Sequence, residues 1–178
     1  IANFSGGQTK TPSFSVLYDK EDSFVRGAAI VALHMKAAGA KVKFTTVVSN
    51  DKNGKFIKNQ LKKNNIKCNY FDEKNRPTTN KNTFISSTYR LLKVDTLSNV
   101  PVSEYTLSKI IDEIKKDKSQ LTVFSDFRHG IFNPSSIQKL INAIPKKSFK
   151  AGDSQVASRW GNITEFKNFN LITPNERE

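Results

Sequence analysis

The sequence predicts an α/β fold with a mostly parallel sheet and a small antiparallel excursion. Helical and strand patterns alternate along most of the 178 residues, which is typical of a parallel sheet covered by helices on both faces. Two stretches, about 13–18 and 82–95, break this alternation and read as strands. The second is interrupted near 87–88 and contains no helical pattern, so we expect these strands to form a small antiparallel lid.

The first half of the chain contains two helix–strand units. A helix is expected over about 27–38, in an alanine-rich stretch followed by Gly39, a residue that commonly ends helices. The β-branched run over 41–48 then favours a strand. Asp51 can cap the next helix, and a short strand is expected over 66–71.

The second half continues the same alternation. Ser103 can cap a third helix whose apolar residues recur at helical spacing, and an apolar strand begins at Leu121. We expect Asn133 to cap a fourth helix with Pro134 at its first position, where proline is well tolerated. The run over 169–173 reads as a buried strand.

The composition excludes several classes of protein. The chain has 29 basic and 16 acidic residues and a net charge of +13, which taken alone would favour nucleic acid as a ligand. The lysines stand singly or in pairs, however, which indicates solvated helix faces, so nucleic-acid binding is not expected as the main function. With Cys68 as the only cysteine and two histidines, an internal disulfide and a Cys/His zinc site are excluded.

No stretch approaches the roughly 20 apolar residues of a membrane span, so we expect a soluble protein without a membrane partner. A single cysteine fits a reducing cytoplasm. The chain starts at Ile1 without a signal-peptide pattern, and it stops at Glu178, where a strand-to-helix junction should continue. We therefore expect a segment of a longer protein, consisting of one incomplete domain over 1–178.

Open α/β sheets bind ligands at the carboxyl ends of their strands, and four places in this sequence are candidates. At the start of the first helix, Gly27 and Ala28 let a polar ligand approach backbone N–H groups. Close helix packing would require the same small residues. The loop 76–81 combines two cations with two hydroxyls, which suits an anionic, oxygen-rich ligand. An exposed turn is the alternative for this loop.

The other two candidate places follow later strands. Asp126 comes directly after an apolar strand, where its carboxylate could hold sugar hydroxyls and Arg128 could meet a phosphate. Helix capping or a tight turn that ends at Gly130 is the competing interpretation. Asn175 and Glu178 lie three positions apart on one helix face and could organise Mg²⁺ through water. A plain strand-to-helix junction would look similar.

Six segments in sequence order resemble the motifs of the PfkB/ribokinase family of carbohydrate kinases. They are similar to the family's GGAANVA, VGDDxxG, RPTTxK, LLRxD, SDYxKG and TPNxxE segments, and they lie at 25–32, 48–54, 76–81, 91–95, 125–130 and 172–178. Within the family, the pattern is most similar to the heptose-7-phosphate kinase domain of the bifunctional proteins of ADP-heptose synthesis. Residues 1–24 are poorly covered by this resemblance.

The resemblance implies a ribokinase-like three-layer sandwich, here incomplete, with a β-lid. It implies transfer of the γ-phosphoryl group of ATP, with Mg²⁺, to a hydroxyl of a sugar or sugar phosphate. The implied substrate-binding residues are Gly27, Ala28, Lys81, Arg90, Asp126 and Arg128. Asn175 and Glu178 would support phosphate and Mg²⁺, with Glu178 acting on the metal through water.

The resemblance also sets limits on what this chain does. The family's catalytic base and most of its ATP site follow the last motif, so no catalytic residue is assigned and the segment is expected to be inactive alone. Arg26 and Ile30 replace a glycine and an asparagine of the family pattern, and Arg128-His129 replaces Gly-Lys. D-glycero-D-manno-heptose 7-phosphate and another sugar phosphate therefore both stay open as substrates.

Two alternatives to a kinase segment are a non-catalytic scaffold of kinase ancestry and a basic nucleic-acid-binding module. A homodimer formed through the lid is the expected protein partnership.

Overall fold

The computed structural model describes residues 2–4, 15–155 and 162–176, and the chain divides into two units. The lid unit comprises Ile1–Phe24 and Thr79–Thr96, and the main unit comprises Val25–Thr78 and Leu97–Glu178. Each unit has sheets of its own.

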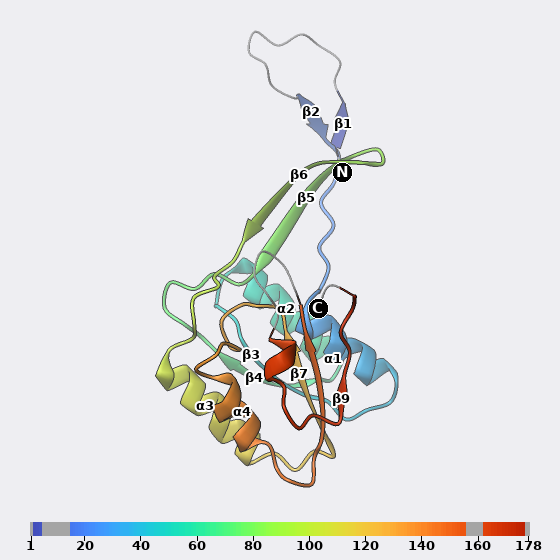
Figure 1. Cartoon of the computed structure of the whole chain (residues 1–178). Helices are drawn as coiled ribbons and strands as arrows, with labels where there is room; N and C mark the ends of the chain where they lie inside the picture. Colours follow the sequence, from blue (N-terminus) through green and yellow to red (C-terminus); the bar gives the residue numbers. More distant parts are fainter. Residues whose placement is uncertain (1, 5–14, 156–161, 177–178) are drawn as a thin grey trace. The chain divides into compact units, whose positions relative to one another are not determined.

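The lid unit is a four-stranded sheet in the order β2-β1-β5-β6 (Figure 1). Its strands are β1 (Ala2–Phe4), β2 (Val16–Tyr18), β5 (Asn80–Ser86) and β6 (Tyr89–Thr96). Strand β5 pairs antiparallel with β6 across a turn at Ser87 and Thr88, and β1 pairs antiparallel with β2. The predicted antiparallel pairing is thus confirmed for the β5–β6 hairpin, but the lid sheet is mixed, because β1 pairs with β5 in parallel. Strand β1 was not predicted, and residues 13–14 of the predicted first lid strand lie outside the described residues.

The β5–β6 hairpin has two chemically different faces, because successive side chains of a strand point to opposite sides. Phe84 lies opposite Leu92 in the pairing, and Lys81 lies opposite Asp95. We define the apolar face by its exposed apolar residues Phe84, Leu92 and Val94; the polar Asn82, opposite Val94, also lies on it. The charged face consists of Lys81, Thr83, Lys93 and Asp95, and Lys93 Nζ lies 3.1 Å from Asp95 Oδ2.

The main unit contains four α-helices and only parallel strand pairs among its described residues. The helices are α1 (Ala28–Ala37), α2 (Lys52–Lys63), α3 (Glu104–Lys115) and α4 (Ile137–Ala143). The strands are β3 (Lys43–Val47), β4 (Lys67–Phe71), β7 (Leu121–Asp126), β8 (Phe149–Ser154) and β9 (Leu171–Ile172), with a short 3₁₀ turn η1 (Ile163–Glu165). The pairs form two hydrogen-bonded groups, β3-β4 and β7-β8-β9. The predicted mostly parallel arrangement is confirmed.

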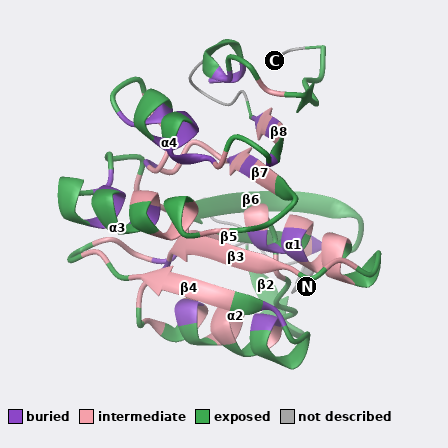
Figure 2. Ribbon diagram, turned by 90° about the horizontal axis from the view of Figure 1, so that it is seen from below, coloured by how far each residue is buried: buried purple, intermediate pink, exposed green. Residues whose placement is uncertain are grey.

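The β3-β4 strands are covered on both faces, as the expected three-layer arrangement requires (Figure 2). Phe44 and Tyr70 pack with the helices α1 and α2, around the fully buried Leu61. Val47 and Phe71 point to the opposite face and pack against the core that α3, α4 and β7 share. The alternation of side chains along the two strands therefore separates two apolar cores.

Polar contacts also join α3 to the β3-β4 strands. Lys43 Nζ lies 3.1 Å from Glu113 Oε2 and 3.3 Å from Asp117 Oδ2, and the Asn69 amide donates to Glu113 at 2.7 Å. The hydrogen bond from Lys43 is the main cause that holds the pKa of Glu113 below its ordinary value. The carboxylate therefore stays charged, and available to Lys43, below the pH at which a free glutamate protonates.

Two predicted helix caps are confirmed and one is wrong. Asp51 accepts the N–H of Gly54 at 2.7 Å, and Ser103 accepts the N–H of Thr106 at 3.2 Å. Asn133 does not cap α4, which begins at Ile137. The Asn133 side chain instead accepts the N–H groups of Ser135 and Ser136, at 3.0 and 3.1 Å, in the turn before the helix. An asparagine can close such a turn locally, and here the turn displaces the helix start.

The prediction of a buried strand over 169–173 is also wrong in part. Strand β9 comprises only Leu171 and Ile172, and their exposed fractions are 49% and 45%. Strand β9 is the outer strand of its group and pairs with β8 alone among the described residues. Phe169, just before the strand, packs into the core instead.

Candidate functional site

The loops that follow β4 and β7 meet at one edge of the main unit. The Arg76 guanidinium, after β4, donates to the carbonyl of His129, after β7, at 3.2 Å. Because all described strand pairs of this unit are parallel, their carboxyl ends gather the loops that can hold a ligand. Several predicted site residues lie on these loops.

Gly27 stands at the start of α1 with φ +64°, a conformation that residues with side chains rarely adopt. No side chain caps the helix there, so its first turn lacks the usual side-chain acceptor. A Cβ placed on Gly27 would lie 3.9 Å from the Phe127 ring. The structure therefore brings the start of α1, with Gly27 and Ala28, next to the loop after β7.

Asp126 ends β7 and is almost completely buried, with an exposed fraction of 1%. Its Oδ1 accepts the backbone N–H of Arg128 at 2.7 Å. Its Oδ2 accepts the hydroxyl of Ser154 at 2.8 Å and the amide of Asn162 at 2.7 Å. Both carboxylate oxygens are thus engaged within the protein, as the tight-turn interpretation of this residue requires.

Arg128 follows in the left-handed region, with φ +65°. Its side chain is mostly buried, and its Nη1 lies 4.0 Å from Asp126 Oδ2. Gly130, two residues on, has φ +89°, and a Cβ there would lie 2.1 Å from the Val100 carbonyl oxygen. Two residues of the loop after β7 therefore have a positive φ, which costs Gly130 nothing but strains Arg128.

The loop 76–81 was predicted to offer its cations and hydroxyls to a ligand, and for two of its residues this is corrected. The Arg76 guanidinium donates to the backbone carbonyls of Ser98, His129, Val100 and Pro101. Thr78 is buried and accepts the N–H of Ser49 at 3.1 Å. The Arg76 guanidinium and the Thr78 hydroxyl therefore form hydrogen bonds within the protein, and these bonds join neighbouring loops.

Hydrogen bonds also link the loops after β3 and β4. Ser49 donates its hydroxyl to the Arg76 carbonyl, and Asp51 accepts the N–H of Thr78 at 2.8 Å. Burial opposes the charged form of Asp51, but the hydrogen bonds from Gly54 and Thr78 outweigh it and lower its pKa. Between these loops lies an open hollow of ≈ 440 Å³, lined by residues 49–51 and 72–77.

Lys81 and Arg90 belong to the lid unit. Lys81 lies on the charged face of the hairpin, and Arg90 pairs with Ile85 beside an irregularity in the register. Both side chains are exposed. Their roles in substrate binding stay predictions.

Asn175 is exposed and follows β9. The segment that leads to it is joined to β8, since Thr173 donates its N–H to Gly152 at 3.2 Å and its hydroxyl to Asp153 at 3.3 Å. Glu178 lies outside the described residues. Among the residues that the structure describes, no group of three His, Cys, Asp or Glu side chains could hold a metal ion, so the proposed role of Glu178 stays a prediction.

Ser154 and Asn162, both buried, belong to the site although the sequence analysis did not assign them a role. They reach Asp126 from positions 28 and 36 residues away. No local pattern in the sequence linked either residue to Asp126, because both lie far from it along the chain.

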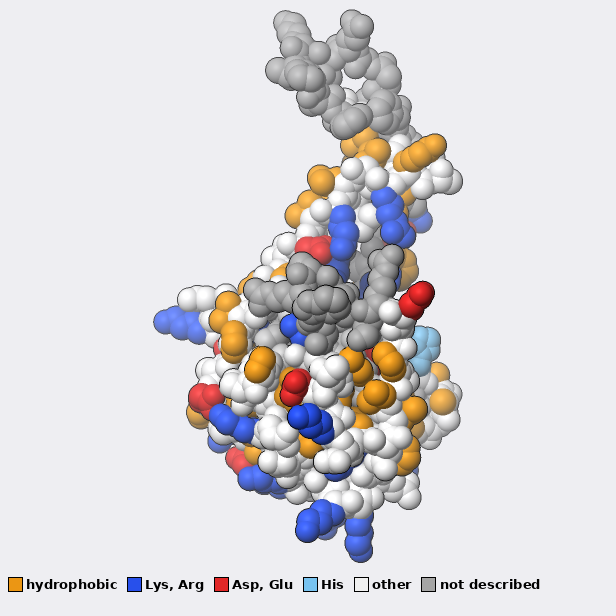
Figure 3. Space-filling model, in the orientation of Figure 1, with side chains coloured by type: hydrophobic (Ala, Val, Ile, Leu, Met, Phe, Trp, Pro, Cys, Tyr) orange, Lys and Arg blue, Asp and Glu red, His pale blue; other side chains and the backbone are white. Residues whose placement is uncertain are grey.

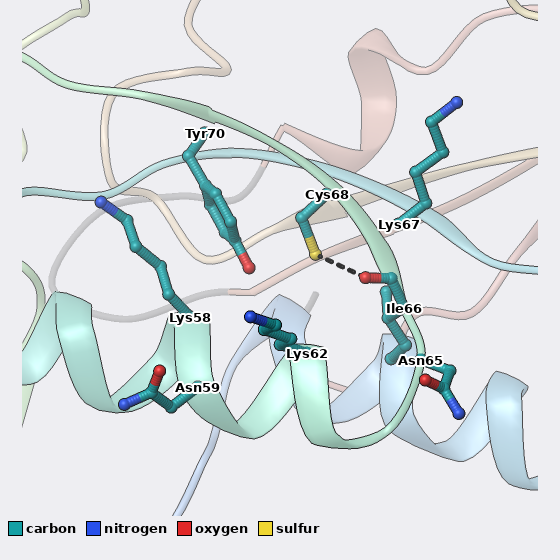
Figure 4. Close-up of a pocket in the computed structure, with 8 residues that line it drawn as sticks. All are labelled: Lys58, Asn59, Lys62, Asn65, Ile66, Lys67, Cys68 and Tyr70. Carbon is teal, nitrogen blue, oxygen red and sulfur yellow. Dashed lines mark hydrogen bonds between the residues drawn. The ribbon is translucent and has the colours of Figure 1, made fainter.

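A second hollow lies between α2 and β4, away from these loops (Figure 4). Its volume is ≈ 520 Å³, and its lining residues include none of the predicted site residues. Figure 4 shows Tyr70 and Cys68 side by side above α2, and burial is the main cause that raises the pKa of both groups. Lys58 Nζ lies 5.5 Å from the Tyr70 ring centroid.

On the face drawn in Figure 3, lysine and arginine side chains stand singly or in small groups between uncharged residues. In the described part of the chain, no helix has the length and apolar character to cross a membrane.

The comparisons with known proteins agree with the motif pattern. A family model described as pfkB family carbohydrate kinase matches residues 27–178. The bifunctional protein HldE of Campylobacter jejuni (strain RM1221) is 30% identical over 163 residues, which are 89% of this chain and 33% of that protein. The chain thus spans about a third of the length of the curated relatives it matches.

Solved structures of sugar kinases share the fold. A putative sugar kinase from Clostridium perfringens superposes with a TM-score of 0.62 at 15% identity, covering 85% of this chain and 46% of that chain. Ribokinase from Giardia lamblia gives a TM-score of 0.52 at 15% identity, over 84% and 47% of the two chains. The family match, the ribokinase-like fold and the ordered motifs agree, and this chain belongs to the pfkB family of carbohydrate kinases.

Proposed function

We propose that this chain carries the acceptor-sugar side of an ATP-dependent kinase, which transfers the γ-phosphoryl group of ATP to a sugar hydroxyl. The observation that carries the proposal is the approach of Gly27 to the loop after β7, where Phe127 and Arg128 lie. A helix start without a side-chain cap, next to a loop that carries an arginine, suits an oxygen-rich and anionic ligand.

The proposed substrate is a sugar phosphate, with D-glycero-D-manno-heptose 7-phosphate as the first candidate and a related sugar phosphate as the second. The resemblance to heptose-phosphate kinases supports the first candidate, and the departures at Arg26 and Ile30 support the second. ATP and Mg²⁺ are the proposed co-substrate and cofactor, with Asn175 and Glu178 supporting the phosphates and the metal through water. A reducing cytoplasm is the proposed location.

A pair of glycine variants tests the acceptor site. Gly27→Ala and Gly39→Ala both place a side chain at a positive φ, at opposite ends of α1, and a Cβ at Gly39 meets no atom within 4 Å. Both variants are therefore expected to lose some stability. Only Gly27→Ala should also weaken binding of heptose 7-phosphate, by about tenfold, because it alters the start of the helix at the site.

The measurement is isothermal titration of the chain with the sugar phosphate. Binding is the suitable readout because the family's catalytic base is expected beyond residue 178. Equal affinities in the two variants would contradict the site, and a wild-type chain that binds no sugar phosphate would favour the scaffold alternative.

We also propose that two copies of the chain pair through the lid unit. The apolar face of the hairpin supports this, because Phe84 and Leu92 are exposed and lie opposite each other. Sedimentation velocity should show a dimer that Leu92→Lys dissociates, since a charge buried at an apolar interface lacks a partner. Thr83→Lys, on the charged face, is the control and should leave the dimer intact. A wild-type chain that sediments as a monomer at every concentration would refute the pairing.

A further inference from the structure

Arg128 adopts a strained backbone conformation in the loop after β7. Its φ of +65° lies in the left-handed region, which costs a residue with a side chain about 1 kcal/mol or more compared with glycine. A glycine would adopt this conformation without that cost. Such strain persists only where the surrounding structure holds the residue in place, so the contacts of this loop indicate what Arg128 does.

The contact on the N-terminal side of Arg128 is made by Asp126. Asp126 Oδ1 accepts the Arg128 N–H at 2.7 Å, which closes the backbone over Phe127. Asp126 Oδ2 is held by Ser154 and Asn162, whose exposed fractions are 0% and 5%. The Ser154 hydroxyl in turn accepts the N–H of Asn162 at 2.7 Å. The carboxylate is therefore fixed by residues from β8 and from the loop that follows it.

The contacts on the C-terminal side come from two other elements. Arg76 donates to the carbonyl of His129 at 3.2 Å, and Val102 donates its N–H to the carbonyl of Gly130 at 3.1 Å. The backbone is thus held immediately before and after Arg128, while the guanidinium itself is left with unfilled hydrogen-bonding capacity. Arg128 Nη1 is buried and has no hydrogen-bond partner among the described residues, since Asp126 Oδ2 lies 4.0 Å away.

These contacts separate the roles of two residues that the sequence analysis grouped together. The oxygens of Asp126 accept hydrogen bonds inside the protein, whereas Nη1 of Arg128 has no partner among the described residues and can donate to a planar or tetrahedral oxyanion. The nearby carboxylate also prevents the arginine from being an isolated buried charge when no ligand is bound.

We propose that Asp126, held by Ser154 and Asn162, is a positioning residue that acts through Arg128, and that Arg128 selects ligands by their phosphate group. This inference rests on the proposed function, because the phosphate would belong to the acceptor sugar. Asp126 makes no contact with the sugar in this account. Its effect on binding passes through the conformation and charge environment of the arginine.

Two serines provide a matched test of the positioning role. Ser154 and Ser136 are both buried, with exposed fractions of 0% and 1%. The Ser154 hydroxyl donates to Asp126, the Ser136 hydroxyl donates to the Ile131 carbonyl with the Asn133 carbonyl as a second acceptor at 3.3 Å, and each hydroxyl accepts one backbone N–H. Ser154→Ala and Ser136→Ala should therefore lower the melting temperature to a similar extent. Ser154 bonds directly to the carboxylate that accepts the Arg128 N–H, whereas the Ser136 hydroxyl bonds the Ile131 carbonyl, three residues after Arg128.

The readout is the preference of the 178-residue chain for heptose 7-phosphate over the unphosphorylated heptose, measured by titration well below the melting temperature. Ser154→Ala should lower this preference by about tenfold, the effect of one lost charge-assisted hydrogen bond, and Ser136→Ala should not change it. Asp126→Asn keeps an acceptor for the Arg128 N–H but removes the charge, so it should retain more of the preference than Asp126→Ala.

Arg128→Gly separates the ligand role from folding. Glycine relieves the left-handed strain, so the melting temperature should stay the same or rise, while the preference for the phosphorylated sugar should disappear. If Ser154→Ala and Ser136→Ala leave the preference equally unchanged, or if Arg128→Gly retains it, the inference is overturned while the proposed function stands. If the wild-type chain binds neither sugar, both fail.

Discussion

Replacement of Phe124 with alanine should lower the free energy of unfolding by about 3–5 kcal/mol, the cost typical of deleting a buried phenylalanine ring. Phe124 lies on β7 with an exposed fraction of 4%. Its ring centroid is 5.0 Å from that of Phe132, 5.4 Å from that of Phe169 and 6.0 Å from that of Phe166. The deletion leaves a cavity among rings from two other segments, the loop before α4 and the stretch between η1 and β9, so the site has little freedom to collapse.

The matched control is Phe149→Ala. Phe149 lies on the neighbouring strand β8, but its exposed fraction is 47%. Its removal should cost about 1 kcal/mol, because less apolar surface returns to water and no cavity remains. Denaturation by urea measures both variants. If Phe124→Ala lowers the free energy of unfolding no more than Phe149→Ala does, the cluster of aromatic rings around Phe124 does not stabilise the main unit.

Arg76→Lys should destabilise the main unit by about 2–3 kcal/mol although it keeps the positive charge. The guanidinium donates to four backbone carbonyls, two of them from Ser98 and His129. A lysine ammonium is a single point with three donors, so it does not reproduce the fork that reaches carbonyls on two loops. The carbonyls that lose their donors include one beside Arg128.

Hydrogen exchange at Val102 reports this change locally, because the Val102 N–H bonds to Gly130 at the edge of the same cluster. We expect faster exchange at Val102 in Arg76→Lys. Arg26→Lys is the control, since Arg26 is exposed and its replacement should alter stability by less than about 0.5 kcal/mol. Unchanged protection of Val102 in Arg76→Lys would mean that the arginine does not support the loop after β7.

Local signals account for the elements that were predicted correctly. The helix α2 begins after Asp51 and α3 begins after Ser103, because each cap bonds an N–H group only three residues away. The same reasoning failed at Asn133, where two local structures compete for one side chain, and the turn that includes Ser135 and Ser136 prevailed. Burial of β9 was not predictable from its apolar residues, since burial depends on which elements cover a strand.

The candidate site was predicted in outline. The motif pattern pointed to Gly27, Asp126 and Arg128, and the structure places the start of α1 next to the loop after β7. The motif pattern did not indicate that the side chains of Arg76 and Thr78 form hydrogen bonds with the protein's own backbone. The sequence of a loop does not distinguish cations and hydroxyls that bind a ligand from those that bond to the protein's own backbone.

The sequence by itself determined the order of helices and strands in the main unit, the antiparallel hairpin of the lid and membership of a kinase family, because periodicity, caps and motifs act over a few neighbouring residues. The tertiary structure alone decided which polar groups are already satisfied inside the protein. Asp126 meets Ser154 and Asn162 across 28 and 36 residues, and only the packing of parallel strands brings such distant donors to one carboxylate. For that reason Arg128, and not Asp126, is left with a hydrogen-bond donor, Nη1, to offer a ligand.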